Sequence, residues 1–405
     1  MSRKLLASLV FLLLVLVVVA GWIYNGGVSA WKKTDTRTGA QVLPGLVLGN
    51  VASLRLNGGK EQTTLELKGK QWTVHERDGY PADVAKIGPL LVKLADLKVI
   101  QTDTITDALA PRLKLAAPGQ ADGGIALDLG DASAKPLGSL LLGKTIDRDS
   151  EIPGATKKIP SGRYLIKREQ PTVAIAINDP LNEADTSPRA WIDKTFIKPE
   201  RIKTFTVTSD GKPRFTLSRS EEAAMAWTLK DAAKGEDLDT GRAQDVAGAL
   251  AGLTMVDVLT ASKPDELGLS GNANEGDVIT AETFDGLTYT LTLGKKDGEN
   301  RALALGVTGK PERARERTPG KDEKAEDKTK LDKEFKDQLA AYDQRVQREL
   351  AMDKKVFLVA DAGVQALLTD RAKLMKQKES SAAPSVPGLD KFEKKAPEKK
   401  APAKK

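Results

Sequence analysis

A segment that occurs twice, 156 residues apart, constrains this chain more than any other feature. The sequence LADLKVI at residues 94–100 returns as LAGLTMV at 250–256. An aspartate, Asp83 in the first copy and Asp239 in the second, lies eleven residues before each segment, and aspartate is a preferred N-cap of helices. Each copy therefore predicts a capped helix that leads into a strand. In the first copy, Gly88-Pro89 is expected to kink or delay the helix, because proline cannot donate a helical hydrogen bond.

The repeat extends toward the N-terminus of both segments. Residues 51–74 and 202–229 each contain alternating apolar and polar runs separated by turns with glycine, a pattern typical of β-hairpins. Each copy then ends its third strand with Trp-Thr and an aliphatic residue, at Trp72 and Trp227. We expect the two tryptophans to be equally buried, each anchoring the core of its module.

The repeat also extends toward the C-terminus. Each copy has a Leu-Gly-Lys strand end and a closing hydrophobic strand that is followed by Asp-Lys or Asp-Arg. The corresponding segments are PRLKL (111–115) and DELGL (265–269), LLLGK (140–144) and LTLGK (291–295), 163–177 and 355–361, and WIDKTFI (191–197) and LTDRAKLM (368–375).

The duplication predicts an α+β fold. We expect two homologous modules, residues 45–200 and 201–375, each a mainly antiparallel sheet with a helix covering one face. The boundary is predicted near Glu200-Arg201.

The second copy contains an insertion, residues 311–352, that the first copy lacks. A charged run begins it, and a stripe at helical spacing follows within residues 331–350: Leu331, Phe335, Leu339, Tyr342, Val346 and Leu350. One interpretation is a helix that packs on its own module; the other is a projecting helix that pairs with a partner, as in a coiled coil. Residues 376–405, rich in Lys, Ala and Pro, are predicted to be a disordered tail.

Residues 1–30 contain an apolar run from Leu5 to Ile23, preceded by Arg3 and Lys4. As a helix, this run would be about 28 Å long, which is enough to cross a bilayer. Its length favours a transmembrane anchor over a cleaved signal peptide, the open alternative. Either interpretation exports the body, and we expect a single-pass protein of the bacterial inner membrane with its body in the periplasm.

Charge and composition exclude several classes of protein. The chain has no cysteine, so disulfides, thiolate metal sites and cysteine nucleophiles are excluded. Of the net charge of +7, the tail from residue 376 supplies five and Arg3 with Lys4 supplies two, so the body is neutral. A neutral body is a poor match for nucleic acid, and no nucleic-acid partner is expected.

The features resemble the bacterial family named domain of unknown function 4340. The matching features are the N-terminal anchor, the Trp-Thr-Val strand from Trp72, Tyr-Pro-Ala-Asp at 80–83, Leu-Ala-x-Leu at 94–97 and 250–253, the Leu-Gly-Lys strand end and the closing strand. The resemblance covers most of residues 45–375. It implies a membrane-anchored extracytoplasmic protein that in some cases accompanies ABC transporter components of the kind linked to gliding motility. The resemblance implies no catalytic residues.

Four sets of residues could suggest chemistry, and each has a simpler interpretation. His75 is the only histidine and is expected at an exposed strand position, without partners for a triad or a zinc site. Ser29-Ala30-Trp31-Lys32 matches S-x-x-K but lacks the companion motifs of penicillin-binding enzymes. Asp147, Asp149 and Glu151 alternate like a calcium loop, yet Ile152 replaces the required glycine. The glycines at 57–59 and 123–124 lack a nucleotide-binding pattern and are interpreted as turn glycines.

The sequence therefore predicts no catalytic, cofactor-binding or metal-binding residue. The expected function is a non-catalytic envelope protein, an accessory or scaffold subunit of an ABC-transporter-like complex. Its expected partners are the membrane and a transporter membrane subunit. The main alternative is a binding module for an envelope polymer or for a small ligand held between the modules; an enzyme comes third.

Overall fold

The computed structural model of the chain describes residues 38–149, 158–222, 226–260, 264–269, 276–319 and 323–376. The predicted anchor 5–23 and the predicted tail, apart from Lys376, lie outside the described residues. Within the described ranges, no helix is long and apolar enough to cross a membrane.

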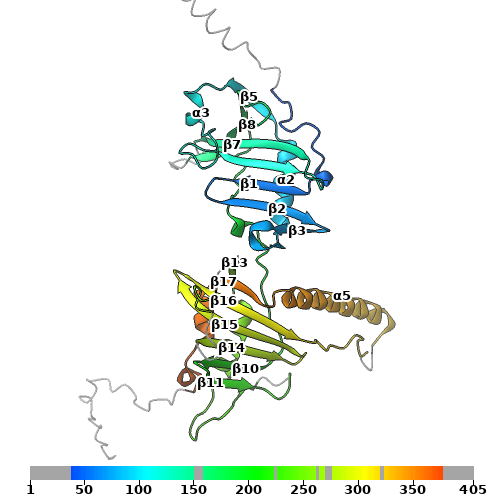
Figure 1. Cartoon of the computed structure of the whole chain (residues 1–405). Coiled ribbons are helices and arrows are strands. Elements are labelled where there is room, and N and C mark those ends of the chain that lie inside the picture. The colour runs from blue at the N-terminus through cyan, green and yellow to red at the C-terminus, as the bar shows by residue number, and fades with distance from the viewer. Residues whose placement is uncertain are drawn as a thin grey trace, which may run out of the picture.

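The body is α+β and contains two mainly antiparallel sheets (Figure 1). In the described part of the chain, the first sheet has nine strands in the order β4-β3-β2-β1-β6-β7-β8-β9-β5. The strands are β1 Ser53–Asn57, β2 Gln62–Lys68, β3 Gln71–Val74, β4 Tyr80–Pro81, β5 Val99–Thr104, β6 Ile125–Gly130, β7 Pro136–Arg148, β8 Ile159–Lys167 and β9 Val173–Ile177.

The second sheet has eight strands among the described residues, in the order β12-β11-β10-β14-β15-β16-β17-β13. They are β10 Ile202–Ser209, β11 Lys212–Ser218, β12 Thr228–Leu229, β13 Met255–Leu259, β14 Asp277–Thr283, β15 Leu287–Asp297, β16 Asn300–Gly309 and β17 Lys355–Ala360.

The two sheets have the same strand order once the two-residue strand β4 is set aside. A register shift, which marks a β-bulge, falls between Val99 and Gln101 in β5 and between Met255 and Asp257 in β13, again 156 residues apart. The prediction of a shared strand order and direction is confirmed. A bulge kept at the same point supports a tandem duplication, because a bulge is a specific local feature of a strand.

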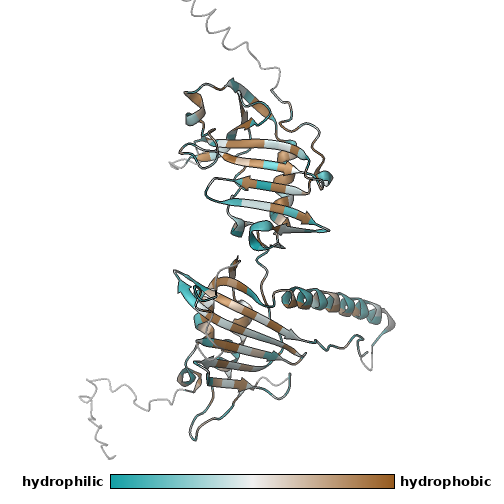
Figure 2. Ribbon diagram, in the orientation of Figure 1, coloured by the Kyte–Doolittle hydropathy of each residue, from teal (hydrophilic) through white to brown (hydrophobic). Residues whose placement is uncertain are grey.

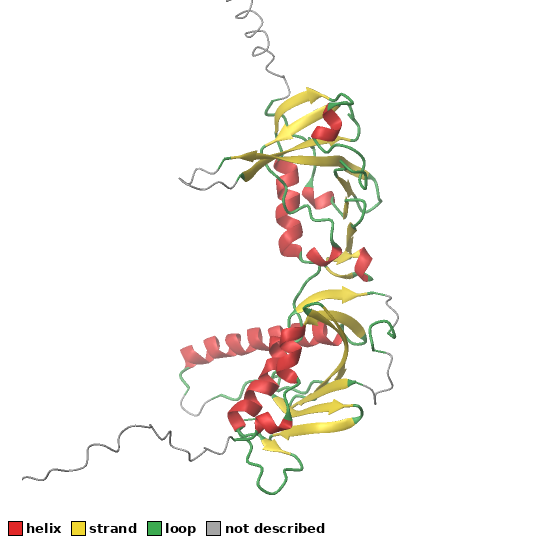
Figure 3. Ribbon diagram, turned by 90° about the vertical axis from the view of Figure 1, so that its left-hand side faces the viewer, coloured by secondary structure: helices red, strands yellow, loops and turns green. Residues whose placement is uncertain are grey.

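The main helices lie on one side of the two sheets, and the opposite faces of both sheets point the same way (Figure 3). The helices are α2 Val84–Asp96, α3 Leu109–Arg112, α4 Thr240–Ala249, α5 Ala325–Leu350 and α6 Asp361–Leu367; the 3-10 helices are η1 Leu48–Asn50, η2 His75–Arg77, η3 Pro188–Ala190, η4 Leu250–Gly252 and η5 Arg371–Leu374. Along the strands, hydrophobic and hydrophilic residues alternate (Figure 2), as expected for sheets with one buried face.

The predicted aspartate caps are present in both modules. The Asp83 carboxylate accepts a hydrogen bond from the N–H of Ala85, and Asp239 accepts from Gly241 and Arg242. Helix α2 starts directly after its cap and runs through Pro89, so the expected delay of the helix is wrong.

The Leu-Gly-Lys segments have the same role in both modules. They lie inside β7 and β15, so the prediction that they end strands is wrong. The N–H of the lysine donates to the carbonyl of Leu113 in the first module and of Leu267 in the second, both at 2.7 Å. A Cβ on Gly143 or Gly294 would lie 2.4 Å from that carbonyl oxygen. Glycine is needed there because the loop backbone approaches the strand too closely for any side chain.

In each module, the C-terminal segment returns to the N-cap of the main helix. The N–H of Asp83 donates to the carbonyl of Trp191 at 2.7 Å, and the N–H of Asp239 donates to Leu374 at 2.8 Å. The repeat therefore includes the segments after the last strands, as the sequence predicted.

The expected equal burial of the two tryptophans is wrong. Trp227 is 3% exposed, whereas Trp72 is half-buried. The Trp227 indole donates to Gln244 on α4 at 2.8 Å, and the Arg219 guanidinium lies 5.0 Å from its ring centroid. These neighbours cover the ring in the second module.

The insertion of the second module forms helix α5, which projects from the body and is mostly hydrophilic (Figures 1 and 2). Near its C-terminal end, Tyr342 and Val346 are each 4% exposed. Phe335 and Leu339 are half-buried, and Leu331 is 38% exposed. The C-terminal half of the helix packs on its own module, as the first interpretation predicted. The N-terminal half projects, and its pairing with a partner stays a prediction.

Candidate functional site

The junction between the two modules contains a buried ion pair. Arg77, in the 3-10 helix after β3, donates through Nε and Nη2 to the two carboxylate oxygens of Asp257 on β13, both at 2.7 Å. The Arg77 side chain is 19% exposed and that of Asp257 is 10% exposed. The hydrogen bond from Arg77 to Asp257 raises the pKa of Arg77. Removing one partner would leave a desolvated charge, so this pair fixes the relative position of the modules.

Aromatic side chains of the two modules also contact one another at the junction. The Phe357 ring on β17 makes edge contacts with Phe196 at 5.0 Å and with Tyr80 at 6.2 Å between centroids. The Tyr80 hydroxyl lies 3.8 Å from the sulfur of Met255. The two modules thus share one apolar core across the junction.

The segment between the modules is held by the insertion. The carboxylate of Glu349 on α5 is fully buried and accepts hydrogen bonds from the N–H of Lys198 at 2.9 Å and the Tyr289 hydroxyl at 2.5 Å. Burial, and then the charge of Glu349, raise the pKa of Tyr289 above its usual value. Arg345 on α5 also donates to the carbonyl of Lys198 and pairs with Glu200 at 2.9 Å. Helix α5 therefore fixes the linker as well as extending from the body.

A second tyrosine contact anchors the base of α5. The Tyr342 hydroxyl donates to Asp285, which is 2% exposed, at 2.7 Å. Burial, followed by this hydrogen bond, raises the pKa of Tyr342 to about 12. Tyr342 therefore remains a neutral donor at physiological pH.

Two hollows lie beside the linker, one of them at the base of α5. One, of about 360 Å³, is lined by residues of α5, the linker and the segment before α5: Lys198, Glu200, Arg313, Gln338, Ala341, Tyr342 and Arg345. The other, of about 220 Å³, lies beside Trp227 and shares Glu200 with the first.

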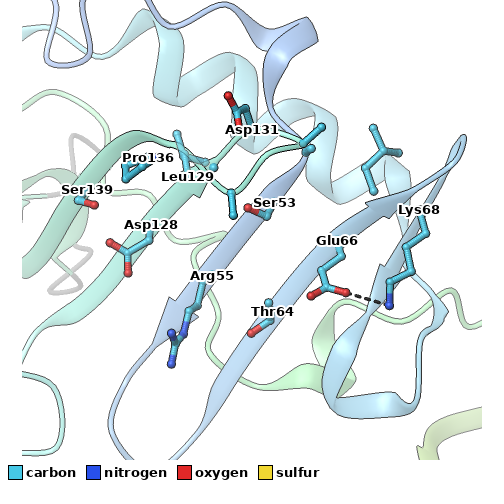
Figure 4. Close-up of a pocket in the computed structure, with 15 residues that line it drawn as sticks. Ser53, Arg55, Thr64, Glu66, Lys68, Asp128, Leu129, Asp131, Pro136 and Ser139 are labelled. Atoms are coloured by element: carbon cyan, nitrogen blue, oxygen red, sulfur yellow. Dashed lines mark ion pairs between the residues drawn. The ribbon is translucent and has the colours of Figure 1, made fainter.

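A larger hollow, of about 570 Å³, lies on the uncovered face of the first sheet (Figure 4). Its lining includes Ser53, Arg55, Thr64, Glu66 and Asp128, which extend from neighbouring strands toward solvent. The lining carries charges of both signs and no aromatic side chain. Such a surface offers hydrogen bonds but no stacking platform.

The residues that suggested chemistry do not come together. The expected exposure of His75 is confirmed, since its side chain is 64% exposed and its Nδ1 lies 3.7 Å from Glu66. The expected strand position is wrong, because β3 ends at Val74 and His75 begins η2. Asp147 lies near the end of β7, Asp149 is exposed, and Glu151 is outside the described residues, as are Ser29 and Lys32. Over the ranges that the structure describes, no three His, Cys, Asp or Glu residues are grouped to hold a metal ion.

The two glycine clusters have different roles. Gly59 has a φ of +91° in the β1–β2 turn, as predicted. Gly123 ends a turn, since its N–H donates to the carbonyl of Gln120 at 3.0 Å, and a Cβ on it would lie 2.5 Å from the carbonyl oxygen of Ala117. Gly124 follows the turn, and a Cβ on it would lie 2.5 Å from the carbonyl oxygen of Leu142. Close backbone approach explains this second cluster.

Sequence reasoning missed the junction residues. The one signal was Asp257, an acid inside the apolar strand MVDVL, because buried charges in proteins are usually paired. Its partner Arg77 is 180 residues away in a polar stretch, and nothing in its neighbours distinguishes it.

Residues 72–271 match the family described as Domain of unknown function (DUF4340). The chain belongs to this family. The DUF4340 match is shorter than the expected 45–375, and it runs from β3 of the first module to the loop before β14 of the second, so it includes the junction. No curated protein and no solved structure shows significant similarity to the chain.

Proposed function

We propose that the chain is a non-catalytic accessory or scaffold subunit of an ABC-transporter-like complex in the bacterial envelope. In this proposal, residues 5–23 anchor it in the inner membrane and the two modules lie in the periplasm. The resemblance to DUF4340 proteins suggests the transporter setting. The observation that carries the proposal is the junction, where a buried ion pair and an aromatic cluster join the modules into one body.

A scaffold must keep its binding surfaces at a fixed separation. Domains in one chain usually move relative to each other unless their interface is large and apolar. Here the two hydrogen bonds from Arg77 to Asp257 add a defined geometry to an apolar contact. Glu349 holds the linker by accepting a hydrogen bond from the N–H of Lys198. A body of this kind keeps binding surfaces on its two modules at a fixed separation.

Helix α5 is the proposed docking element. Its buried base fixes its direction, while Leu331 and the half-buried Phe335 offer apolar contacts on the projecting part. Paired helices bury such a stripe against a partner helix.

The test is co-purification of the transporter membrane subunit with the full-length chain from native membranes. Leu331→Asp should leave the melting temperature unchanged and abolish co-purification. Val346→Asp, in the packed half, should lower the melting temperature and serves as the matched control. Retention of the transporter subunit by Leu331→Asp would contradict docking through α5, and its absence from the wild-type complex would contradict the accessory role.

The hollow on the first sheet favours a second candidate function, binding of an envelope polymer. Its polar lining can bind hydroxyl or amide groups along an extended chain. Sedimentation with purified cell-wall polymer should then depend on Arg55, and Arg55→Ala should release the protein. Equal sedimentation of the wild-type and Arg55→Ala proteins would exclude polymer binding by this surface.

A further inference from the structure

Four arginines gather where the linker enters the second module. Arg201 and Arg219 line the hollow beside Trp227, and Arg313 and Arg345 line the hollow at the base of α5. Glu200 lines both, so the two hollows adjoin. This concentration of positive charge stands out because the body as a whole is neutral.

Aromatic rings, rather than acids, position two of these arginines. The Arg313 guanidinium lies 4.6 Å from the centroid of Tyr342. That of Arg219 lies 5.0 Å from Trp227 and 5.6 Å from Phe284. In the described part of the chain, neither arginine forms an ion pair within 4.0 Å. Stacking on a ring leaves N–H groups at the edge of a guanidinium able to bind a planar anion. In Arg219, Nε already donates to the carbonyl of Ile202 at 2.7 Å, so the terminal nitrogens are the ones that would bind.

Two carboxylates of the chain already occupy this cluster. Glu200 pairs with Arg345 at 2.9 Å. Glu222 accepts from Nε and Nη2 of Arg201, both at 2.5 Å. The hydrogen bond from Arg201, followed by the charges of Arg201, Arg219 and Arg313, lowers the pKa of Glu222. Arg201 therefore binds Glu222 directly, Arg219 and Arg313 contribute positive charge to its surroundings, and the Glu222 side chain is 47% exposed.

We propose that this arginine cluster, Arg201, Arg219, Arg313 and Arg345, is a docking site for an acidic peptide segment of a partner protein. The incoming carboxylate takes the place of Glu222. The internal occupant sets the chemistry, because Glu222 is a glutamate that lies next to a second exposed acid, Glu221. Arginine binds carboxylates through two parallel hydrogen bonds, and the adjoining hollows leave room for the residues that flank the carboxylate.

Fluorescence anisotropy of a labelled hexapeptide with two adjacent glutamates, titrated with the full-length chain, tests the proposal. Glu222→Gln removes the internal competitor, so it should tighten binding severalfold. Arg313→Ala should weaken binding about tenfold, the effect of losing one charge-assisted hydrogen bond. Arg315→Ala is the matched control: it is two residues away, its guanidinium pairs with Asp343, and it lines neither hollow.

The opposite effects of the two substitutions make the test specific. A loss of stability would weaken binding in both variants, whereas the proposal requires Glu222→Gln to strengthen it. Equal binding by wild type and Arg313→Ala, or equal binding of the peptide with glutamines in place of glutamates, would overturn the proposal. Displacement of the peptide by inorganic phosphate at equal concentration would overturn its assignment to an acidic peptide.

Discussion

Arg77 of the first module and Asp257 of the second form a bidentate ion pair, with both N–O distances at 2.7 Å. In the first module, the position that corresponds to Asp257 on the equivalent edge strand is Gln101. The residue that locks the modules together is therefore missing from the free end of the first sheet. The contact joins the two copies of the repeat, and the first copy carries no acid at the position equivalent to Asp257.

The first prediction concerns this ion pair. Asp257→Ala should reduce the free energy of unfolding by about 3 kcal/mol, because Arg77 would keep a buried charge without a partner. Urea denaturation measures the change. Asp128→Ala, which removes the exposed partner of Arg168, should change stability by less than about 1 kcal/mol. Equal effects of the two substitutions would contradict the locking role.

The second prediction concerns the glycines of the two Leu-Gly-Lys segments, Gly143 and Gly294. Gly143→Ala and Gly294→Ala should each destabilise the protein by about 1–3 kcal/mol, because the new methyl group would overlap a carbonyl oxygen. Gly88→Ala is the control, since a Cβ there meets nothing within 4 Å and alanine favours the helix by up to about 1 kcal/mol. Thermal unfolding should therefore give shifts of opposite sign.

The third prediction concerns pH. Hydrogen bonds from Lys296 and then Arg301 lower the pKa of Asp361 to about 2. Since the folded pKa is below the unfolded one, the stabilisation is fully present above about pH 4 and is lost as the pH falls toward 2. Asp361→Asn should cost up to about 2 kcal/mol at pH 7 and almost nothing at pH 2. Urea denaturation of both proteins between pH 2 and pH 7 measures the difference in their free energies of unfolding. A difference that does not change with pH would contradict the prediction.

The fourth prediction concerns the N-terminal segment. If residues 5–23 are an uncleaved anchor, the native protein should remain with membranes through a carbonate wash, and a chain that starts at Thr34 should be released. Fractionation and N-terminal sequencing measure both outcomes. Native protein free in a periplasmic extract, with an N-terminus at Gly21 or Trp31, would establish a cleaved signal peptide instead.

Local patterns in the sequence were sufficient to predict the repeated architecture. The caps at Asp83 and Asp239, the hairpins and the shared strand order depend on neighbouring residues, whose spacing and turn chemistry are visible in one segment. The two copies also reinforced each other, because a weak pattern such as Leu-Gly-Lys becomes informative when it recurs in the same place. The two copies differ in the burial of Trp72 and Trp227, because the residues that cover each ring are different.

The tertiary structure alone decided the junction and the arginine cluster. Arg77 meets Asp257 across 180 residues, and Glu222 meets Arg201 from a separate hairpin. Such contacts depend on how two finished modules approach each other and on where the insertion packs. A charged side chain in the sequence does not show whether it will face water or a partner, because desolvation and pairing arise only once the surfaces have met.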